Sequence, residues 1–401
     1  MVCAMARVSV SCTGASVDNE PAGKLAHIDV LRGIAILAVI ICHHGLEFSQ
    51  LEGLRWLSAV GRLGVQLFFV ASAVTLCRSA MHRAGEPRRW SSFFVRRLFR
   101  IAPLYYLALI FYALVRGTAP GIVPDGELPG LYAPVNVLAN LLFVHGFLPG
   151  AYNDVVPGGW SIAAEMAFYL MFPALFVGAT KVERRGGLRA LALVTVGMWL
   201  LCLGGQVAIF FATGVTPDEP FVYSSIINQL PVFMVGMIAF FAVEREGARA
   251  IPDASALFVL TGAPTVLLLL CPIPLADQFV PMLAAVSFVF LLSAVRTRLT
   301  RGGLLAEIGR RSYSIYIVHF AVVWLAGGIV DTLAAESARV QLALYLPTLL
   351  GAVAVSFAVA GATGRIIERP FIALGERWIS RRRLADRGCI ARTPLYGSAL
   401  P

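Results

Sequence analysis

The 401-residue sequence predicts an all-α polytopic membrane protein with about ten transmembrane helices and with both termini in the cytoplasm. Three observations lead to this prediction. Hydrophobic residues make up 58% of the chain and charged residues 14%, whereas soluble domains have about 45–50% and about 25%. The apolar residues form runs of roughly 17–25 residues, the length that spans the hydrocarbon of a bilayer. Basic residues gather in the short segments between alternate runs.

Ten apolar runs are predicted as membrane spans. They cover residues 28–48, 61–80, 99–116, 160–179, 188–213, 222–243, 254–271, 277–295, 312–330 and 340–364. The stretch 134–149 is also apolar, but it is short and ends in Pro149-Gly150, so a re-entrant or interfacial segment is expected there. The spans define three parts of the chain: a cytoplasmic N-terminal segment (1–26), a transmembrane domain (27–375) and a basic cytoplasmic tail (376–401).

The distribution of Lys and Arg sets the orientation. With the N-terminus in the cytoplasm, 29 of the 33 basic residues fall in cytoplasmic segments and four fall outside. Cytoplasmic loops of membrane proteins carry such an excess. The net charge of +10 therefore indicates membrane topology and not a nucleic-acid partner, which would need the charge on one face of a soluble domain.

The seven cysteines form no CxxC pair and have no metal-ligand spacing. Most lie within or beside apolar runs, where free cysteine is a small apolar residue. The sequence therefore predicts neither a disulfide framework nor a metal site.

Ionisable residues inside a span are costly and mark functional sites. The first span contains Asp29, Arg32, His43 and His44. His43 lies eleven residues after Arg32, roughly 16 Å deeper along a helix, which is near the middle of the bilayer. An imidazole at that depth needs a polar cavity or a polar partner. The alternative is a structural histidine that is hydrogen-bonded between helices.

Two further candidates lie in later spans. Glu165 follows Trp160-Ser161 at the outer end of the fourth span. The alternative to a functional role is that Glu165 lies at the membrane interface and its carboxylate reaches water. Tyr316 and His319 are three residues apart and share a helix face, which makes them candidates for a functional site. The alternative is that Tyr316 belongs to an aromatic belt and that His319 only packs against its neighbours.

A basic cluster precedes the third span. Arg97 and Arg100 are three residues apart on one helix face, and guanidinium groups bind phosphates well. Fixing the topology is the alternative role, although seven basic residues in one loop exceed what topology needs.

These residues fall in motifs that resemble the family-3 membrane acyltransferases. Ile28 to Ala35 is similar to the family's opening motif, and Arg32 with His43 matches its Arg-x10-His pattern. Further similar segments are Gly64 to Ser72, Arg96 to Tyr105, Trp160 to Glu165, Ser312 to His319 and Glu368-Arg369-Pro370. Two positions differ from the family: Ala73 stands where glycine is usual, and Met166 where a second acid often follows Glu165.

The resemblance implies a bacterial multi-pass enzyme of the inner membrane that transfers an acyl group, usually acetyl, from acyl-CoA to a hydroxyl of a cell-surface polysaccharide or other glycoconjugate. It implies that His43 and Glu165 are catalytic and that Arg32, Arg97 and Arg100 bind the donor. It also implies that five further residues contact the substrate or support the structure of the site: Asp29, Trp160, Ser161, Tyr316 and His319. Acyl-CoA is then a donor substrate, and no permanently bound cofactor is expected.

The sequence leaves two other functions open. An acyltransferase acting on a small glycosylated secondary metabolite, such as a macrolide, would use the same scaffold with a different acceptor. A polytopic exporter would also need polar groups at mid-membrane depth, but it would more often show inverted repeats, which this sequence lacks.

Overall fold

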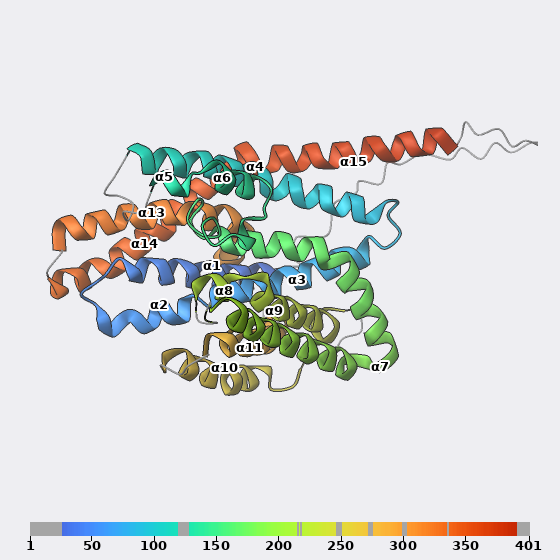
Figure 1. Ribbon diagram of the computed structural model, residues 1–401, viewed down its shortest axis with the longest axis horizontal. Helices are drawn as coiled ribbons and strands as arrows, with labels where there is room; N and C mark the ends of the chain where they lie inside the picture. Colours follow the sequence, from blue (N-terminus) through green and yellow to red (C-terminus); the bar gives the residue numbers. More distant parts are fainter. Residues whose placement is uncertain are drawn as a thin grey trace, which may run out of the picture.

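A computed structural model describes residues 26–118, 128–214, 216, 219–245, 251–271, 276–298, 303–334 and 337–390. Throughout these ranges the regular secondary structure is helical and contains no strand (Figure 1). The predicted all-α membrane class is confirmed. Most of the N-terminal segment and the end of the basic tail lie outside the described residues.

The longer helices run roughly along the long axis of the molecule (Figure 1). They are α1 (Ala26–Leu46), α3 (Gly64–His82), α4 (Arg89–Thr118), α7 (Gly159–Thr213), α9 (Ile226–Ala239), α10 (Ala254–Leu270), α11 (Ala276–Arg298), α13 (Ser312–Ala334), α14 (Ala338–Thr363) and α15 (Arg369–Ile390). Shorter elements connect them: η1 (Glu52–Leu54), α2 (Arg55–Gly61), α5 (Leu128–Leu131), α6 (Pro134–Leu141), η2 (His145–Phe147), α8 (Pro220–Ser224), η3 (Phe240–Glu244), α12 (Gly303–Arg310) and η4 (Gly364–Glu368).

Eight helical segments of the described chain are long and apolar enough to cross a membrane. One of them, α7, has 55 residues and would be about 82 Å long as a straight helix, far more than a hydrocarbon core of about 30 Å. It is broken at Gly187, whose φ of 64° and ψ of −167° are not helical. Its two halves match the predicted spans 160–179 and 188–213. The 17-residue helix α10 matches the predicted span 254–271 but is shorter than the other eight.

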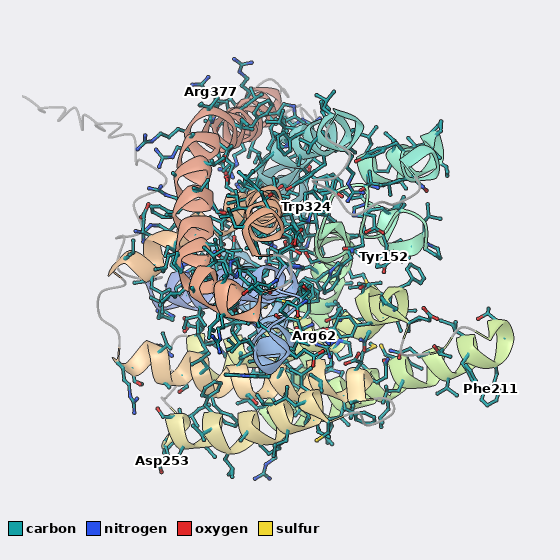
Figure 2. All side chains as sticks on the ribbon, turned by 90° about the vertical axis from the view of Figure 1, so that its left-hand side faces the viewer. Arg62, Tyr152, Phe211, Asp253, Trp324 and Arg377 are labelled. Atoms are coloured by element: carbon teal, nitrogen blue, oxygen red, sulfur yellow. The ribbon has the colours of Figure 1, made fainter. Side chains whose placement is uncertain are left out.

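Helix α1 lies in the middle of the bundle (Figure 1) and packs against α2, α3, α11, α12, α13 and α14. The second half of α7 and helix α10 lie at the periphery: Figure 2 shows Phe211, in the last turn of α7, at the right edge and Asp253, just before α10, at the lower left. The candidate residues of α1 are therefore surrounded by protein and not by lipid.

The segment predicted as re-entrant or interfacial forms α6 and η2. Helix α6 has eight residues, about 12 Å, which is too short to cross a bilayer. It is fixed to the middle of α4, where the Tyr105 hydroxyl donates a 2.7 Å hydrogen bond to Asn140 and the Tyr106 hydroxyl donates one to the Leu141 carbonyl. This segment is therefore attached to α4 by side-chain hydrogen bonds and is too short to form a further span.

Candidate active site

A narrow cavity of about 80 Å³ lies between α1, α3, α4, α7 and α13. Polar side chains from all five helices line it, so the tertiary fold gathers residues that are far apart in the sequence. Six of the ten site residues predicted from the sequence are among them: Arg32, Arg97, Arg100, Ser161, Glu165 and Tyr316.

The cavity carries an excess of positive charge. Arg32 donates a 3.1 Å hydrogen bond to the Thr75 hydroxyl. The Arg97 guanidinium lies 5.7 Å from the ring centroid of Tyr169. Within the described residues neither Arg97 nor Arg100 forms an ion pair, and Glu165 is the one carboxylate among the residues that line the cavity. Three guanidinium groups facing one carboxylate favour an anionic ligand.

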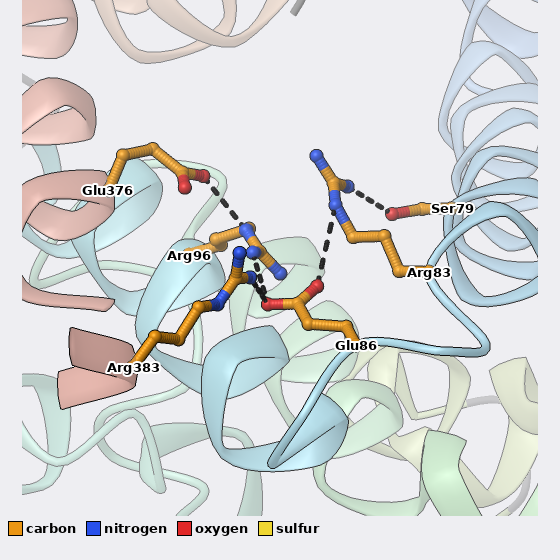
Figure 3. A network of polar contacts seen from close by, with 6 residues as sticks. All are labelled: Ser79, Arg83, Glu86, Arg96, Glu376 and Arg383. Atoms are coloured by element: carbon orange, nitrogen blue, oxygen red, sulfur yellow. Dashed lines mark hydrogen bonds and ion pairs between the residues drawn. The ribbon is translucent and has the colours of Figure 1, made fainter. Parts of the chain in front are cut away.

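The neighbouring Arg96 has a different environment (Figure 3). It donates hydrogen bonds of 2.6 Å to Glu86 and 2.8 Å to Glu376, and Arg383 also binds Glu86. Successive side chains on a helix point about 100° apart, so Arg96 faces α15 while Arg97 faces the cavity. Two carboxylates already neutralise Arg96, and its role is to attach α15 to α4.

Glu165 is held by two hydroxyl groups. Its carboxylate accepts hydrogen bonds from Ser72 on α3 and from Tyr169, at 2.6 Å, one turn further along α7. In the described part of the chain its side chain bonds to these two groups and not to His43. The two residues predicted to be catalytic thus occupy separate places, with Glu165 inside the arginine cavity.

His43 lies beside His319, with 5.3 Å between the ring centroids. The Phe320 ring packs on both imidazoles, at 4.4 Å from His43 and 4.1 Å from His319. The His43 side chain is partly accessible, whereas His319 is fully buried. The adjacent His44 points elsewhere: it is buried against α14, where it forms a 2.9 Å hydrogen bond with Thr348.

Tyr316 links the arginine cavity to the histidine pair. It lines the cavity, and its ring lies 5.5 Å from that of His319. Its hydroxyl accepts a 2.7 Å hydrogen bond from Ser161 and donates one of 3.0 Å to the Gly158 carbonyl. Gly158 has a φ of 71°, and a Cβ there would lie 2.6 Å from the Phe320 ring, so the position requires glycine on both counts.

The remaining predicted residues support the site from outside the cavity. Asp29 forms a 3.7 Å ion pair with Arg310 of α12. The Trp160 ring packs against Phe69 and Tyr223. The described structure thus shows structural contacts for both residues.

Two motif observations from the sequence are explained by packing. At Ala73, where the family usually has glycine, the methyl group faces Gly236 of α9, and a Cβ at Gly236 would lie 2.7 Å from it. Gly236 thus provides the small residue that the close contact of α3 with α9 requires. The two closing motifs bind each other, because the Ser314 hydroxyl donates a hydrogen bond to the Glu368 carboxylate.

Three residues at the site were not predicted: Thr75, Tyr169 and Phe320. Tyr169 lies four residues after Glu165, a spacing that places both on one helix face and provides a signal. Thr75 follows the Ser72 motif by three residues, which is a weaker signal. For Phe320 the sequence offers no signal, because an apolar residue in an apolar span cannot be distinguished from its neighbours by composition.

Comparison with known proteins gives the family. The profile of the acyltransferase domain matches residues 25–363. The acyltransferase MdmB of Streptomyces mycarofaciens is 25% identical, over 90% of this chain and 94% of its own length. A putative O-acetyltransferase of Staphylococcus aureus strain COL is 25% identical over 74% of this chain, and the peptidoglycan O-acetyltransferase OatA of Listeria monocytogenes is 23% identical over 86%.

The chain spans about half of the length of the Staphylococcus and Listeria relatives, 50% and 55%. No solved structure matches. The profile covers most of the chain, including His43, Glu165 and the arginine cluster, and the helical membrane fold agrees with it. This protein therefore belongs to the acyltransferase family 3 and is a multi-pass membrane O-acyltransferase.

Proposed function

We propose that this enzyme lies in the bacterial plasma membrane and takes acetyl-CoA from the cytoplasm. It transfers the acetyl group to a hydroxyl of a cell-surface polysaccharide or other glycoconjugate. The observation that carries the proposal is the arginine cavity, in which Arg32, Arg97 and Arg100 face the single carboxylate Glu165 while a histidine pair lies behind Tyr316.

The donor is assigned from charge and position. Acetyl-CoA carries phosphate groups at one end and the thioester at the other, and arginine binds phosphate through forked, charge-assisted hydrogen bonds. Arg32 lies about 16 Å before His43 along α1. A donor whose phosphates contact the arginines can thus extend its thioester arm along α1 toward the histidines.

The chemistry requires a base or nucleophile of near-neutral pKa, and histidine provides either. As a base, His43 takes the proton of the acceptor hydroxyl, whose oxygen bonds to the acetyl carbon while the carbon–sulfur bond breaks, and the proton passes to the CoA thiolate. As a nucleophile, a ring nitrogen of His43 bonds to the acetyl carbon while the carbon–sulfur bond breaks and CoA leaves as the thiolate. The acceptor oxygen then bonds to the acetyl carbon while the carbon–nitrogen bond breaks, and the hydroxyl proton passes to the thiolate. Both routes need a ring nitrogen with a free lone pair.

The acceptor class rests on the relatives. The Listeria relative is named as a peptidoglycan O-acetyltransferase, which favours a glycan hydroxyl. The Streptomyces relative matches over nearly its whole length and is named only as an acyltransferase. That name leaves the acceptor open, and a small glycosylated metabolite is the second candidate acceptor.

The purified protein in lipid vesicles, supplied with acetyl-CoA labelled in the acetyl group, tests the proposal. We expect labelled ester on peptidoglycan or polysaccharide fragments and none with the His43→Ala variant. If both acceptors are supplied and only a glycosylated macrolide becomes acetylated, the small glycosylated metabolite is established as the acceptor class. Transfer from acetyl phosphate but not from acetyl-CoA would contradict the donor assignment.

A further inference from the structure

The histidine pair contains a buried nitrogen that the proposed reaction does not use. His319 Nδ1 lies 2.7 Å from the Tyr316 carbonyl oxygen. A carbonyl only accepts hydrogen bonds, so Nδ1 carries the proton and the neutral ring has its lone pair on Nε2. This Nε2 is buried and has no hydrogen-bond partner within the described structure.

A group able to donate to this lone pair is available on His43, whose ring lies beside that of His319. A distance of 5.3 Å between ring centroids allows two ring nitrogens that point at each other to approach to about 3 Å, a hydrogen-bond distance. In the described structure no hydrogen bond to His43 is formed, and the interplanar angle is 49°. The last side-chain torsion of histidine is broad, so the ring of His43 aligns at small cost.

The surroundings favour this bond over a bond to water. Phe320 packs on both rings, and the exposed fraction of His319 is 0%. Leaving a buried acceptor without a partner destabilises the folded protein, and a hydrogen bond from His43 removes that cost. His44, on the same helix, already has Thr348 as a partner and does not compete.

We propose that His319 is a positioning residue, whose Nε2 accepts the ring N–H of His43 and thereby keeps the lone pair of His43 on the nitrogen that takes part in acyl transfer. This inference rests on the proposed function, and it assigns His319 a defined role in it. The arrangement is comparable to that of other catalytic histidines, which a second group holds in one tautomer.

The substitutions His319→Leu and His319→Gln separate positioning from packing. Leucine fills the space without an acceptor, whereas glutamine supplies a carbonyl oxygen near the place of Nε2. We expect kcat to fall about 100-fold in His319→Leu and at most about tenfold in His319→Gln, with KM for acetyl-CoA within about twofold of wild type in both. His44→Gln is the matched control and should keep kcat per folded molecule. Near-normal kcat in His319→Leu, or an equal loss in both variants, would overturn the inference.

A second measurement does not depend on activity or on the stability of the His319 variants. In protein labelled with ¹⁵N-histidine, wild-type His319 should show a protonated Nδ1 and a hydrogen-bonded Nε2 lone pair, and His43→Ala should shift the Nε2 signal while His44→Ala should not. An Nε2 signal unchanged by His43→Ala would overturn the inference. If wild type transfers no acetyl group, the proposed function fails, and the spectrum alone still decides the contact between the two histidines.

Discussion

The Ser161 hydroxyl donates a 2.7 Å hydrogen bond to the Tyr316 hydroxyl, 155 positions further along the chain. This bond joins the first turn of α7 to α13 at the cavity wall, and Tyr316 extends it to the Gly158 carbonyl. Removing the Tyr316 hydroxyl takes away one hydrogen-bond partner of Ser161 and one of the Gly158 carbonyl, while the aromatic ring stays in place.

The substitution Tyr316→Phe is therefore expected to lower kcat by about tenfold, because misplacement of groups around a reacting centre is costly. Acetyl transfer per folded molecule is the measurement. Tyr112→Phe is the matched control, since Tyr112 is equally buried and donates a 2.7 Å hydrogen bond to the Ile317 carbonyl without lining the cavity. Equal activity losses in the two variants would show that the effect of Tyr316 is structural.

His43→Ala should abolish acyl transfer while the protein still inserts and accumulates, because His43 is partly accessible beside His319. His44→Ala should instead lower the amount of folded protein, since it removes a fully buried imidazole and its hydrogen bond with Thr348. The comparison is specific activity per folded molecule in membranes supplied with acetyl-CoA. Near-normal specific activity in His43→Ala would refute the proposed mechanism.

Arg97→Ala combined with Arg100→Ala should raise KM for acetyl-CoA by about tenfold or more and change kcat less, because phosphate contacts far from the thioester contribute uniform binding. Arg96→Ala serves as the control. Its ion pairs with Glu86 and Glu376 attach α15, so its loss should lower the unfolding temperature and leave KM unchanged. A KM that responds only to Arg96→Ala would contradict the assignment of the donor site.

The stability of the ion-pair network of Glu86 with Arg96 and Arg383 should depend on pH. Burial raises the pKa of Glu86, but hydrogen bonds and charges of Arg96 and Arg383 outweigh it, so that the pKa lies below its ordinary value of 4.5. A carboxyl group with a lowered pKa contributes stability above its unfolded pKa, and this contribution is lost as the pH falls through the folded value. Glu86→Gln should lower the unfolding temperature in detergent at pH 7, and the difference from wild type should shrink below about pH 4.5. A difference that stays constant over this range would argue against the ionic contribution.

The predicted topology is tested by single cysteines placed at Asp154 and at Arg377, both exposed, in a background without the native cysteines. With ten spans, a membrane-impermeant maleimide should label position 154 in whole cells and position 377 only after the membrane is opened. Labelling of both positions from the same side would contradict the predicted orientation.

The sequence by itself determined the membrane class, the helical fold and the approximate limits of most spans. These depend on run length, hydropathy and the placement of Arg and Lys, which are local properties that the bilayer selects directly. The motif containing Arg32 and His43 is also local, since both residues lie on one helix at a fixed spacing. The break in α7 is local as well, because two apolar runs flank the charged stretch before Gly187.

Only the tertiary structure decided which polar groups meet. Adjacent residues in sequence separate, so that Arg96 binds carboxylates while Arg97 faces the cavity, and His44 bonds to Thr348 while His43 lies beside His319. Glu165 could be placed in a span from the sequence, and its spacing from Tyr169 signals a shared helix face, but its partner Ser72 on α3 could not be predicted. The physical reason is that a helix sets the direction of each side chain only relative to its own axis, whereas the packing of α1 among its neighbours sets what each side chain faces.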